Sequence, residues 1–216
     1  MRAAAIITAA GSGSRMEIST NKVLLPFSGG TVVEAAVLPF TNSDKFQKII
    51  ITYSKEDKKA LEEALRDLAV PLQFIEGGST RQESVFLGLK ALETDSPATV
   101  LIHDAARPWL TEELVSSVLE QAESSGSSVP VVPSVNAMKE IDGNGLILRH
   151  LKRVQTVSAQ TPQGFSYKKI LASHTKAREE KFNAIDDTEI WDRYESPVHS
   201  VPGDPANKKI TYKGDL

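Results

Sequence analysis

The chain has no cysteine among its 216 residues, which excludes disulfides, thiolate zinc sites and cysteine nucleophiles. It also has little excess charge, and a formal net charge of −3 gives no reason to expect a nucleic-acid partner. No apolar run approaches the roughly 20 residues that a membrane-spanning helix needs, so no membrane association is expected. The apolar residues 3–10 pass directly into a glycine-rich stretch. This favours a buried strand over a signal peptide, and we expect a cytoplasmic protein.

What is present is an alternation of short apolar segments with amphipathic ones. Apolar, β-branched runs predict strands at residues 3–8, 48–53, 72–75, 99–102 and 128–132. Apolar residues at helical spacing among charged ones predict helices at residues 55–68, 84–92 and 111–123. Strands that are apolar throughout and alternate with helices are typical of a mostly parallel sheet with helices on both faces. We therefore predict a single α/β domain over residues 1–216.

Residues 136–157 depart from this pattern. The DGNG turn at residues 142–145 separates two extended arms at residues 137–141 and 146–151, which predicts a β-hairpin that projects from the body. An isolated hairpin is marginally stable in water. We therefore expect this arm to pack on a second subunit and to form a homodimer.

Three loops with unusual residues follow predicted strands, at residues 9–16 (AAGSGSRM), 77–84 (GGSTRQES) and 103–108 (HDAARP). The carboxyl ends of parallel strands meet at one edge of a sheet, and binding sites in such sheets lie there. We therefore expect the three loops to form one site.

The first loop has the features of an anion site. Gly11 and Gly13 leave backbone N–H groups open to an anion. The dinucleotide motif would need a glycine at Met16, and a P-loop would need Gly-Lys-Ser/Thr, so neither fits. Arg15 and Lys22 add two cations that suit a polyphosphate whose charge is redistributed during reaction. The alternative is a tight surface turn with two solvated basic side chains.

The other loops offer a metal ligand and structural groups. Asp104 at the end of a buried strand is a natural Mg²⁺ ligand beside a phosphate site, and the alternative is an ion pair with Arg107 that fixes the turn. His103 is expected to be structural, because phosphoryl transfer depends mainly on positioning and electrostatics. Ser79 or Thr80 is expected to cap the following helix. The acidic pair at residues 186–187 is likewise more typical of a helix start than of a metal site.

The motifs AAGSGSRM, Lys22, GGSTRQESV, HDAARP, QTPQGF and GDPANKKIT occur in the order found in 2-C-methyl-D-erythritol 4-phosphate cytidylyltransferases. The chain resembles this family over almost its whole length, and HDAARP together with QTPQGF is specific to the family and its close relatives. The resemblance implies a Rossmann-like nucleotidyltransferase fold in which residues 136–157 form a β-arm for dimerisation. It also implies cytidylyl transfer from CTP to 2-C-methyl-D-erythritol 4-phosphate with release of pyrophosphate, in the non-mevalonate route to isoprenoid precursors.

The resemblance also implies roles for the residues of the nucleotide side. The residues that would hold the triphosphate belong to the first loop and are Ala9, Ala10, Gly11 and Gly13. Arg15 and Lys22 would stabilise the pentacoordinate transition state. Gly78 and Ser84 would contact the cytosine, and Arg81 would support their loop.

On the other side of the reacting phosphorus, the resemblance implies a metal and an acceptor site. Asp104 would bind Mg²⁺ or another divalent cation, and Arg107 would line the acceptor side. Arg153, Thr161 and Lys209 would hold the phosphate of the polyol, with Arg153 reaching into the site of the neighbouring subunit.

Ala137 and Ile185 depart from the family pattern on the acceptor side, because they stand where relatives have threonines. They leave open a ribitol 5-phosphate cytidylyltransferase, which uses a different polyol phosphate on the same scaffold. A non-catalytic nucleotide-binding relative is the alternative from another class, since a fold alone does not establish an activity. The presence of Arg15, Lys22 and Asp104 argues against a non-catalytic relative, which would be expected to lose some of these residues.

Overall fold

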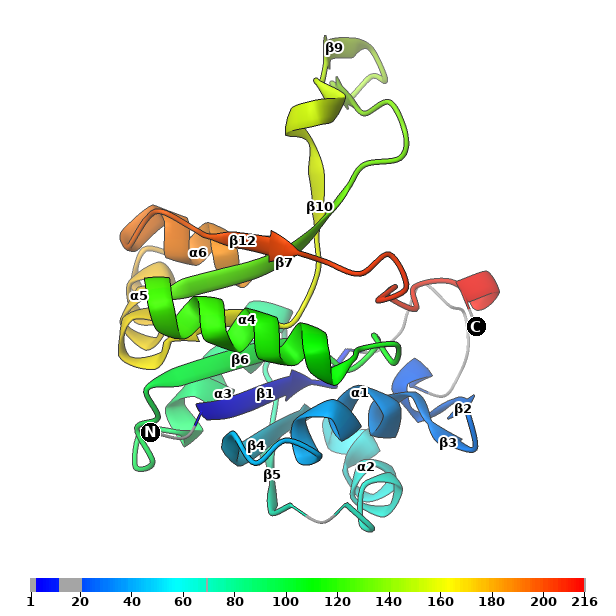
Figure 1. Cartoon of the computed structure of the whole chain (residues 1–216), viewed down its shortest axis with the longest axis vertical. Helices are drawn as coiled ribbons and strands as arrows, with labels where there is room; N and C mark the ends of the chain where they lie inside the picture. Colours follow the sequence, from blue (N-terminus) through cyan, green and yellow to red (C-terminus); the bar gives the residue numbers. More distant parts are fainter. Residues whose placement is uncertain (1–2, 12–20, 69, 216) are drawn as a thin grey trace.

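A computed structural model describes residues 3–11, 21–68 and 70–215 of the chain. Within these residues the centre is an eight-stranded sheet in the order β10-β7-β11-β6-β1-β4-β5, with β12 also paired to β7 (Figure 1). Its strands are β1 (Ala3–Thr8), β4 (Phe46–Tyr53), β5 (Leu72–Glu76), β6 (Thr99–Asp104), β7 (Ser127–Pro133), β10 (Val157–Ala159), β11 (Gln163–Ser166) and β12 (Ser200–Pro202). The first four run parallel, whereas β11 is antiparallel to both β6 and β7. The predicted mostly parallel sheet is confirmed.

Helices cover both faces of this sheet (Figure 1). They are α1 (Val32–Thr41), α2 (Lys58–Ala64), α3 (Arg81–Ala91), α4 (Glu112–Ser125), α5 (Tyr167–Glu179) and α6 (Asp187–Tyr194). Side chains of α1, α2 and α4 share one apolar core, and those of α3, α5 and α6 share another. The molecule is therefore built in three layers.

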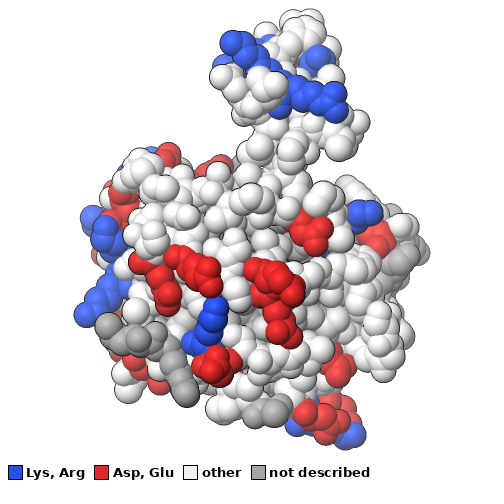
Figure 2. Space-filling model, viewed as in Figure 1, with Lys and Arg blue, Asp and Glu red and all other residues white. Residues whose placement is uncertain are grey.

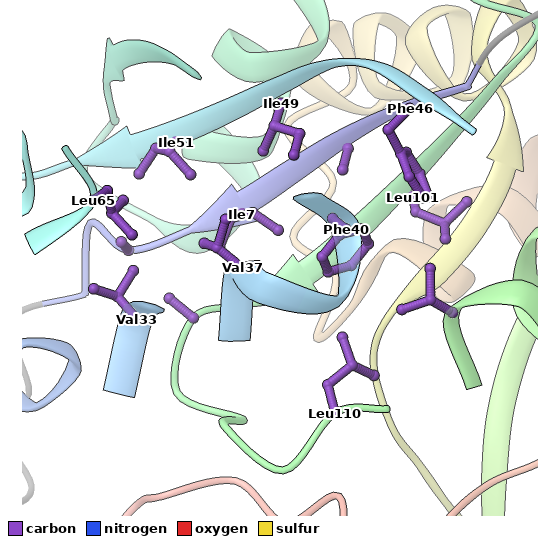
Figure 3. Close-up of a cluster of buried hydrophobic side chains, with 14 of the residues drawn as sticks. Ile7, Val33, Val37, Phe40, Phe46, Ile49, Ile51, Leu65, Leu101 and Leu110 are labelled. Atoms are coloured by element: carbon purple, nitrogen blue, oxygen red, sulfur yellow. The ribbon is translucent and has the colours of Figure 1, made fainter. Parts of the chain in front are cut away.

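The side chains of β1 explain why its sequence is apolar throughout. Ala5 and Ile7 belong to the core under α1, whereas Ala4 and Ile6 belong to the core under α3. Successive side chains of a strand point to opposite faces, so a strand buried on both faces needs apolar residues at every position. Figure 3 shows Ile7 in the first core, with Val37 of α1 on the same side of the sheet.

The remaining elements are short. They are the 3₁₀ turns η2 (Lys22–Leu24), η3 (Lys55–Asp57), η4 (Arg153–Gln155) and η5 (Lys213–Asp215), and the strand pairs β2 (Pro26–Phe27) with β3 (Gly30–Thr31) and β8 (Lys139–Ile141) with β9 (Ile147–His150). Among the described residues, no helix combines the length and apolarity needed to span a membrane.

The predicted hairpin is present as β8 and β9, which stand away from the body on an extended stalk (Figure 1). Its large apolar side chains are exposed, and Val154 on the arm has 93% of its surface accessible. Figure 2 shows Lys and Arg side chains gathered on this arm, whereas acidic side chains gather on the face of the body in the same view. The arm is thus apolar and basic, and in the single chain it has little to pack on.

Several elements differ from the sequence-based prediction. The helix predicted over residues 55–68 is the turn η3 followed by the shorter α2. The prediction did not include α1, which begins at a capping box between Thr31 and Glu34 and contains Pro39. It also did not include α5 or the antiparallel strand β11, and of α6 it included only the start at the acidic pair of residues 186–187.

Candidate active site

A pocket of about 400 Å³ opens at the carboxyl ends of the parallel strands. The lining residues come from the three loops singled out in the sequence, from the end of β1 and from two further segments. They are Thr8, Ala9, Ala10, Gly11, Lys22, Val23, Gly78, Ser79, Thr80, Arg81, Ser84, Asp104, Ala106 and Lys209. The sequence-based expectation that the three loops form one site is therefore confirmed.

Asp104 is a buried carboxylate surrounded by cations. Its Oδ1 accepts a hydrogen bond from Nε of Arg81 at 3.0 Å, and its Oδ2 accepts one from Nζ of Lys209 at 2.6 Å. The guanidinium of Arg107 lies 4.0 Å from the same Oδ2. Burial alone would raise the pKa of Asp104, but Arg81 and Lys209 hold that pKa well below its usual range. The carboxylate is therefore ionised at neutral pH.

Arg81 is the first residue of α3, and its guanidinium joins two carboxylates. Its Nη1 donates to Oδ2 of Asp187 at 2.8 Å, while its Nε bonds Asp104. Burial would lower the pKa of Arg81, but the two carboxylates raise that pKa above its ordinary value. Arg81 therefore stays charged with both edges of its guanidinium occupied.

The loop after β5 is close to both the first loop and α3. The N–H of Gly78 donates to Oγ of Ser84 at 3.1 Å, and that hydroxyl donates to the carbonyl of Thr80. A Cβ on Gly77 would lie 2.6 Å from Cβ of Ala10, so only glycine fits between the two loops. Thr80 is the N-cap of α3, because its hydroxyl accepts from the N–H of Glu83. The capping alternative considered for this loop is thus correct, and the loop lines the pocket as well.

Behind Asp104 lies a buried hydrogen-bonded set that fixes the end of β6. The N–H of Asp104 donates to Oγ1 of Thr161, which lies 2.9 Å from Nδ1 of His103. Nε2 of the same ring lies 3.4 Å from the carbonyl of Arg107. Burial lowers the pKa of His103 to about 3. A neutral ring with its proton on Nε2 satisfies both contacts, with the Thr161 hydroxyl donating to Nδ1.

The C-terminal segment closes one side of the pocket. The Lys22 ammonium donates to the carbonyl of Ile210 at 2.7 Å, and Nη1 of Arg107 donates to the carbonyl of Asn207 at 2.9 Å. Lys209 of the same segment bonds Asp104. These contacts join residues about a hundred or more positions apart, so a segment near the end of the chain is built into the loop site.

Comparison with known proteins shows which family the chain belongs to. A family model described as 2-C-methyl-D-erythritol 4-phosphate cytidylyltransferase matches residues 3–216. Proteins of that name from Prochlorococcus marinus (strain MIT 9313) and Bacillus cereus (strain ATCC 10987 / NRS 248) are 36% and 33% identical to the chain, over 98% of it and 93% of each relative. The chain belongs to this cytidylyltransferase family. It is thus an enzyme of nucleotidyl transfer.

Solved structures agree with this membership. The 4-diphosphocytidyl-2C-methyl-D-erythritol synthase of Anaerococcus prevotii DSM 20548 is 29% identical and superposes with a TM-score of 0.88, over 99% of this chain and 92% of that one. The 2-C-methyl-D-erythritol 4-phosphate cytidylyltransferase of Thermus thermophilus is 31% identical, with a TM-score of 0.80 over 100% and 95% of the two chains. The nucleotidyltransferase fold expected from the motifs is confirmed.

Most of the site residues predicted for this cytidylyltransferase lie together. Those that line the pocket are Ala9, Ala10, Gly11, Lys22, Gly78, Arg81, Ser84, Asp104 and Lys209. Arg107 and Thr161 do not line it but support Asp104 from behind. Gly13 and Arg15 lie outside the described residues.

Among the described residues, Arg153 is a predicted site residue that lies away from the pocket, on the arm. It begins the turn η4 on the arm, and its guanidinium donates to the backbone carbonyls of Ser134 and Val135. Any contact of Arg153 with a pocket would have to be made by another copy of the chain.

The sequence-based prediction did not include two buried residues of the site. Asp186 is the N-cap of α6, as expected for an acidic pair at a helix start, but Asp187 instead accepts from Arg81 and contacts His174. The sequence signal at Asp187 was only that it forms an acidic pair with its neighbour. Nothing in the sequence indicated that Arg81 of α3 is its partner.

A divalent cation is a general requirement of nucleotidyl transfer from a triphosphate, and the donor set of this pocket fits one. Asp104 is an ionised carboxylate on the pocket wall. The described residues hold no group of three or more acidic or histidine side chains that would form an all-protein cage. Mg²⁺ is commonly held by one or two carboxylates together with substrate phosphates and water. A pocket with one carboxylate on its wall is consistent with that mode of binding.

Proposed function

We propose that this enzyme transfers the cytidylyl group of CTP to 2-C-methyl-D-erythritol 4-phosphate, forming 4-diphosphocytidyl-2-C-methyl-D-erythritol and pyrophosphate, as a step of non-mevalonate isoprenoid biosynthesis. One observation carries the proposal: a single pocket combines a glycine-containing backbone loop, the cations Lys22 and Lys209 and the carboxylate of Asp104. The family supports methylerythritol phosphate rather than ribitol phosphate as the acceptor.

The chemistry needs no protein nucleophile and no general base. The acceptor phosphate is already ionised at neutral pH, so the main barrier is repulsion between two anions and the charge that develops at the α-phosphorus. Lys22 and Arg15 stabilise that charge, while the first loop holds the triphosphate through its N–H groups. Lys209 holds the acceptor phosphate near the α-phosphorus, which turns a bimolecular encounter into a local one.

The remaining pocket residues select and orient the substrates. Gly78 and Ser84 contact the cytosine, and Arg81 supports their loop and the carboxylate of Asp104. Mg²⁺, or another divalent cation held by Asp104, supplies additional positive charge on the phosphates when it is bound. Arg107 and Thr161 keep the end of β6 in place on the acceptor side.

The working unit that we propose is a cytoplasmic homodimer of single nucleotidyltransferase domains, joined by the arm at residues 136–157. The exposed apolar side chains of the arm support this, because a water-exposed hairpin with an apolar surface gains stability by packing on a partner. In the dimer, Arg153 of one copy would enter the acceptor side of the other copy's pocket.

The direct test is release of pyrophosphate from CTP and Mg²⁺, with 2-C-methyl-D-erythritol 4-phosphate and ribitol 5-phosphate offered in parallel. Release with the first acceptor alone is expected. Release with ribitol 5-phosphate alone would keep the chemistry and overturn the proposed acceptor. No release with either acceptor, from protein shown to be folded, would overturn the proposed reaction.

A further inference from the structure

A continuous series of hydrogen-bonded side chains runs from the pocket into the layer of α5 and α6. Lys209 bonds Asp104 at 2.6 Å, Asp104 bonds Arg81 at 3.0 Å, and Arg81 bonds Asp187 at 2.8 Å. The far end is His174 of α5, whose Nε2 lies 3.1 Å from Oδ1 of Asp187. Lys209, Asp104 and Arg81 line the pocket, whereas Asp187 and His174 do not.

The two residues at the far end are among the most buried polar groups of the described chain. Asp187 and His174 are each 1% exposed. A buried carboxylate is costly unless cations or hydrogen-bond donors compensate it, and Arg81 and His174 occupy both of its oxygens. Because neither residue lines the pocket, the connection of the pair to it runs through the hydrogen bond of Asp187 with Arg81.

The geometry of Arg81 makes that action specific. A guanidinium is a rigid plane, so carboxylates bonded at two of its edges fix its orientation as well as its position. With Arg81 fixed by Asp187, Oδ1 of Asp104 accepts from Arg81 while its Oδ2 accepts from Lys209. The negative charge of Asp187 also offsets the positive charge of Arg81. More of the negative charge of Asp104 is then available to a cation in the pocket.

We propose that Asp187, held by His174, is a positioning residue that fixes Arg81 and thereby holds the carboxylate of Asp104, whose Oδ2 also accepts from Lys209, in place for the divalent cation that accompanies the nucleotide. This inference rests on the proposed function, because it concerns the cation at that site. Asp187 and His174 touch neither the substrates nor the reacting atoms.

Substitution of Asp187 by Asn keeps the shape of the side chain and removes its charge. The full charge of Arg81 then acts on Asp104 alone, and the guanidinium is free to turn. Affinity for Mn²⁺ in the presence of CTP, measured by electron paramagnetic resonance, should fall by about 10-fold, as is typical when a partner of a metal ligand is removed. At saturating metal, kcat should return to near the wild-type value, because no group that contacts the substrate has been changed.

His174 provides a second test that leaves Arg81 and both carboxylates in place. His174→Leu removes the contact to Asp187 and should weaken Mn²⁺ binding in the same direction, whereas His174→Gln keeps an N–H donor and should stay within about 2-fold of wild type. If Asp187→Asn does not fold, the Leu and Gln variants carry the test. Asp95→Asn is the matched control, because it breaks an ion pair with Lys48 at the opposite edge of the sheet.

The outcomes separate this inference from the proposed function. Wild-type protein that binds no Mn²⁺–CTP complex would overturn the proposed function itself. Wild-type binding with unchanged Mn²⁺ affinity in folded Asp187→Asn or His174→Leu would overturn only the inference and leave these residues structural. A loss of kcat that saturating metal does not restore would also overturn it, since a positioning role for the cation predicts recovery.

Discussion

At the scale of single residues, Lys22 shows how the fold holds a cation at the pocket. Its ammonium group is buried and donates to the carbonyl of Ile210, so it is held in place before any substrate binds. Such a fixed charge lowers a reaction barrier without reorganisation during the reaction. We predict that Lys22→Met lowers kcat by about 10²-fold or more, measured by pyrophosphate release at saturating CTP.

Lys208→Met is the matched control for that prediction, because Lys208 is exposed and does not line the pocket. Its turnover should be close to that of the unmodified enzyme. Equal turnover in the two variants would contradict the role given to Lys22.

His103 makes a second residue-scale prediction, on stability rather than on rate. Burial lowers the pKa of His103 to about 3, against an ordinary value of 6.5. Between these values the unfolded chain binds a proton that the folded chain does not, so the free energy of unfolding falls as pH is lowered through this window. The slope from one such group is at most about 1.4 kcal/mol per pH unit.

The replacement His103→Gln cannot titrate, so its free energy of unfolding should fall less steeply between pH 7 and pH 4.5 than that of the unmodified chain. Urea denaturation at several pH values measures both slopes. The variant should also be less stable at pH 7, because it loses buried hydrogen bonds worth about 1 kcal/mol each. Parallel slopes would show that His103 is protonated to the same extent in the two states.

At the scale of elements, the close approach of α4 to β11 depends on a glycine. A Cβ on Gly164 would lie 2.8 Å from Cβ of Ala122 and 3.2 Å from Cγ1 of Val118, both on α4. The helix would have to move away from the sheet to accept it. We predict that Gly164→Ala lowers the free energy of unfolding by about 1–3 kcal/mol, the usual cost of overpacking, measured by urea denaturation.

Gly143 in the turn of the arm gives the control, because a Cβ there would meet no atom within 4 Å. Gly143→Ala should change the free energy of unfolding little. A similar loss in both variants would contradict the role given to the α4–β11 contact.

At the scale of the whole molecule, the arm is the feature that the single chain leaves unexplained. Ile141 and Leu148 are exposed apolar side chains of the hairpin, at 60% and 58% of their surface. We predict that Ile141→Glu with Leu148→Glu converts a dimer into a monomer in sedimentation velocity and lowers activity, because Arg153 then has no neighbouring pocket to enter. The melting of the α/β body should be nearly unchanged.

A matched substitution on the body is Leu38→Glu, which also charges an exposed leucine but lies on α1. It should leave the sedimentation coefficient as it is. An unmodified chain that sediments as a monomer would reject the arm as a dimer element.

Sequence patterns alone were enough to predict the parallel centre of the sheet and the place of the site. Runs such as residues 3–8 and 99–102 are apolar at every position, and only burial on both faces explains that pattern. The loops after them carried Gly11, Lys22 and Asp104, and parallel strands bring their carboxyl ends to one edge. Local chemistry likewise indicated the DGNG hairpin, because its turn is encoded by adjacent residues.

The pairing of charges, in contrast, became visible only in the folded chain. The ion pairs of Arg81 with Asp104 and Asp187 join residues 23 and 106 positions apart, and Lys209 reaches Asp104 across 105 positions. The α5 helix and β11 were likewise outside the prediction, and of α6 only its start at the acidic pair was predicted. A four-residue strand carries almost no periodicity, and α5 places few apolar residues among many polar ones. Local sequence fixes the conformation of a segment, whereas partners distant in the chain are fixed by packing against the common sheet.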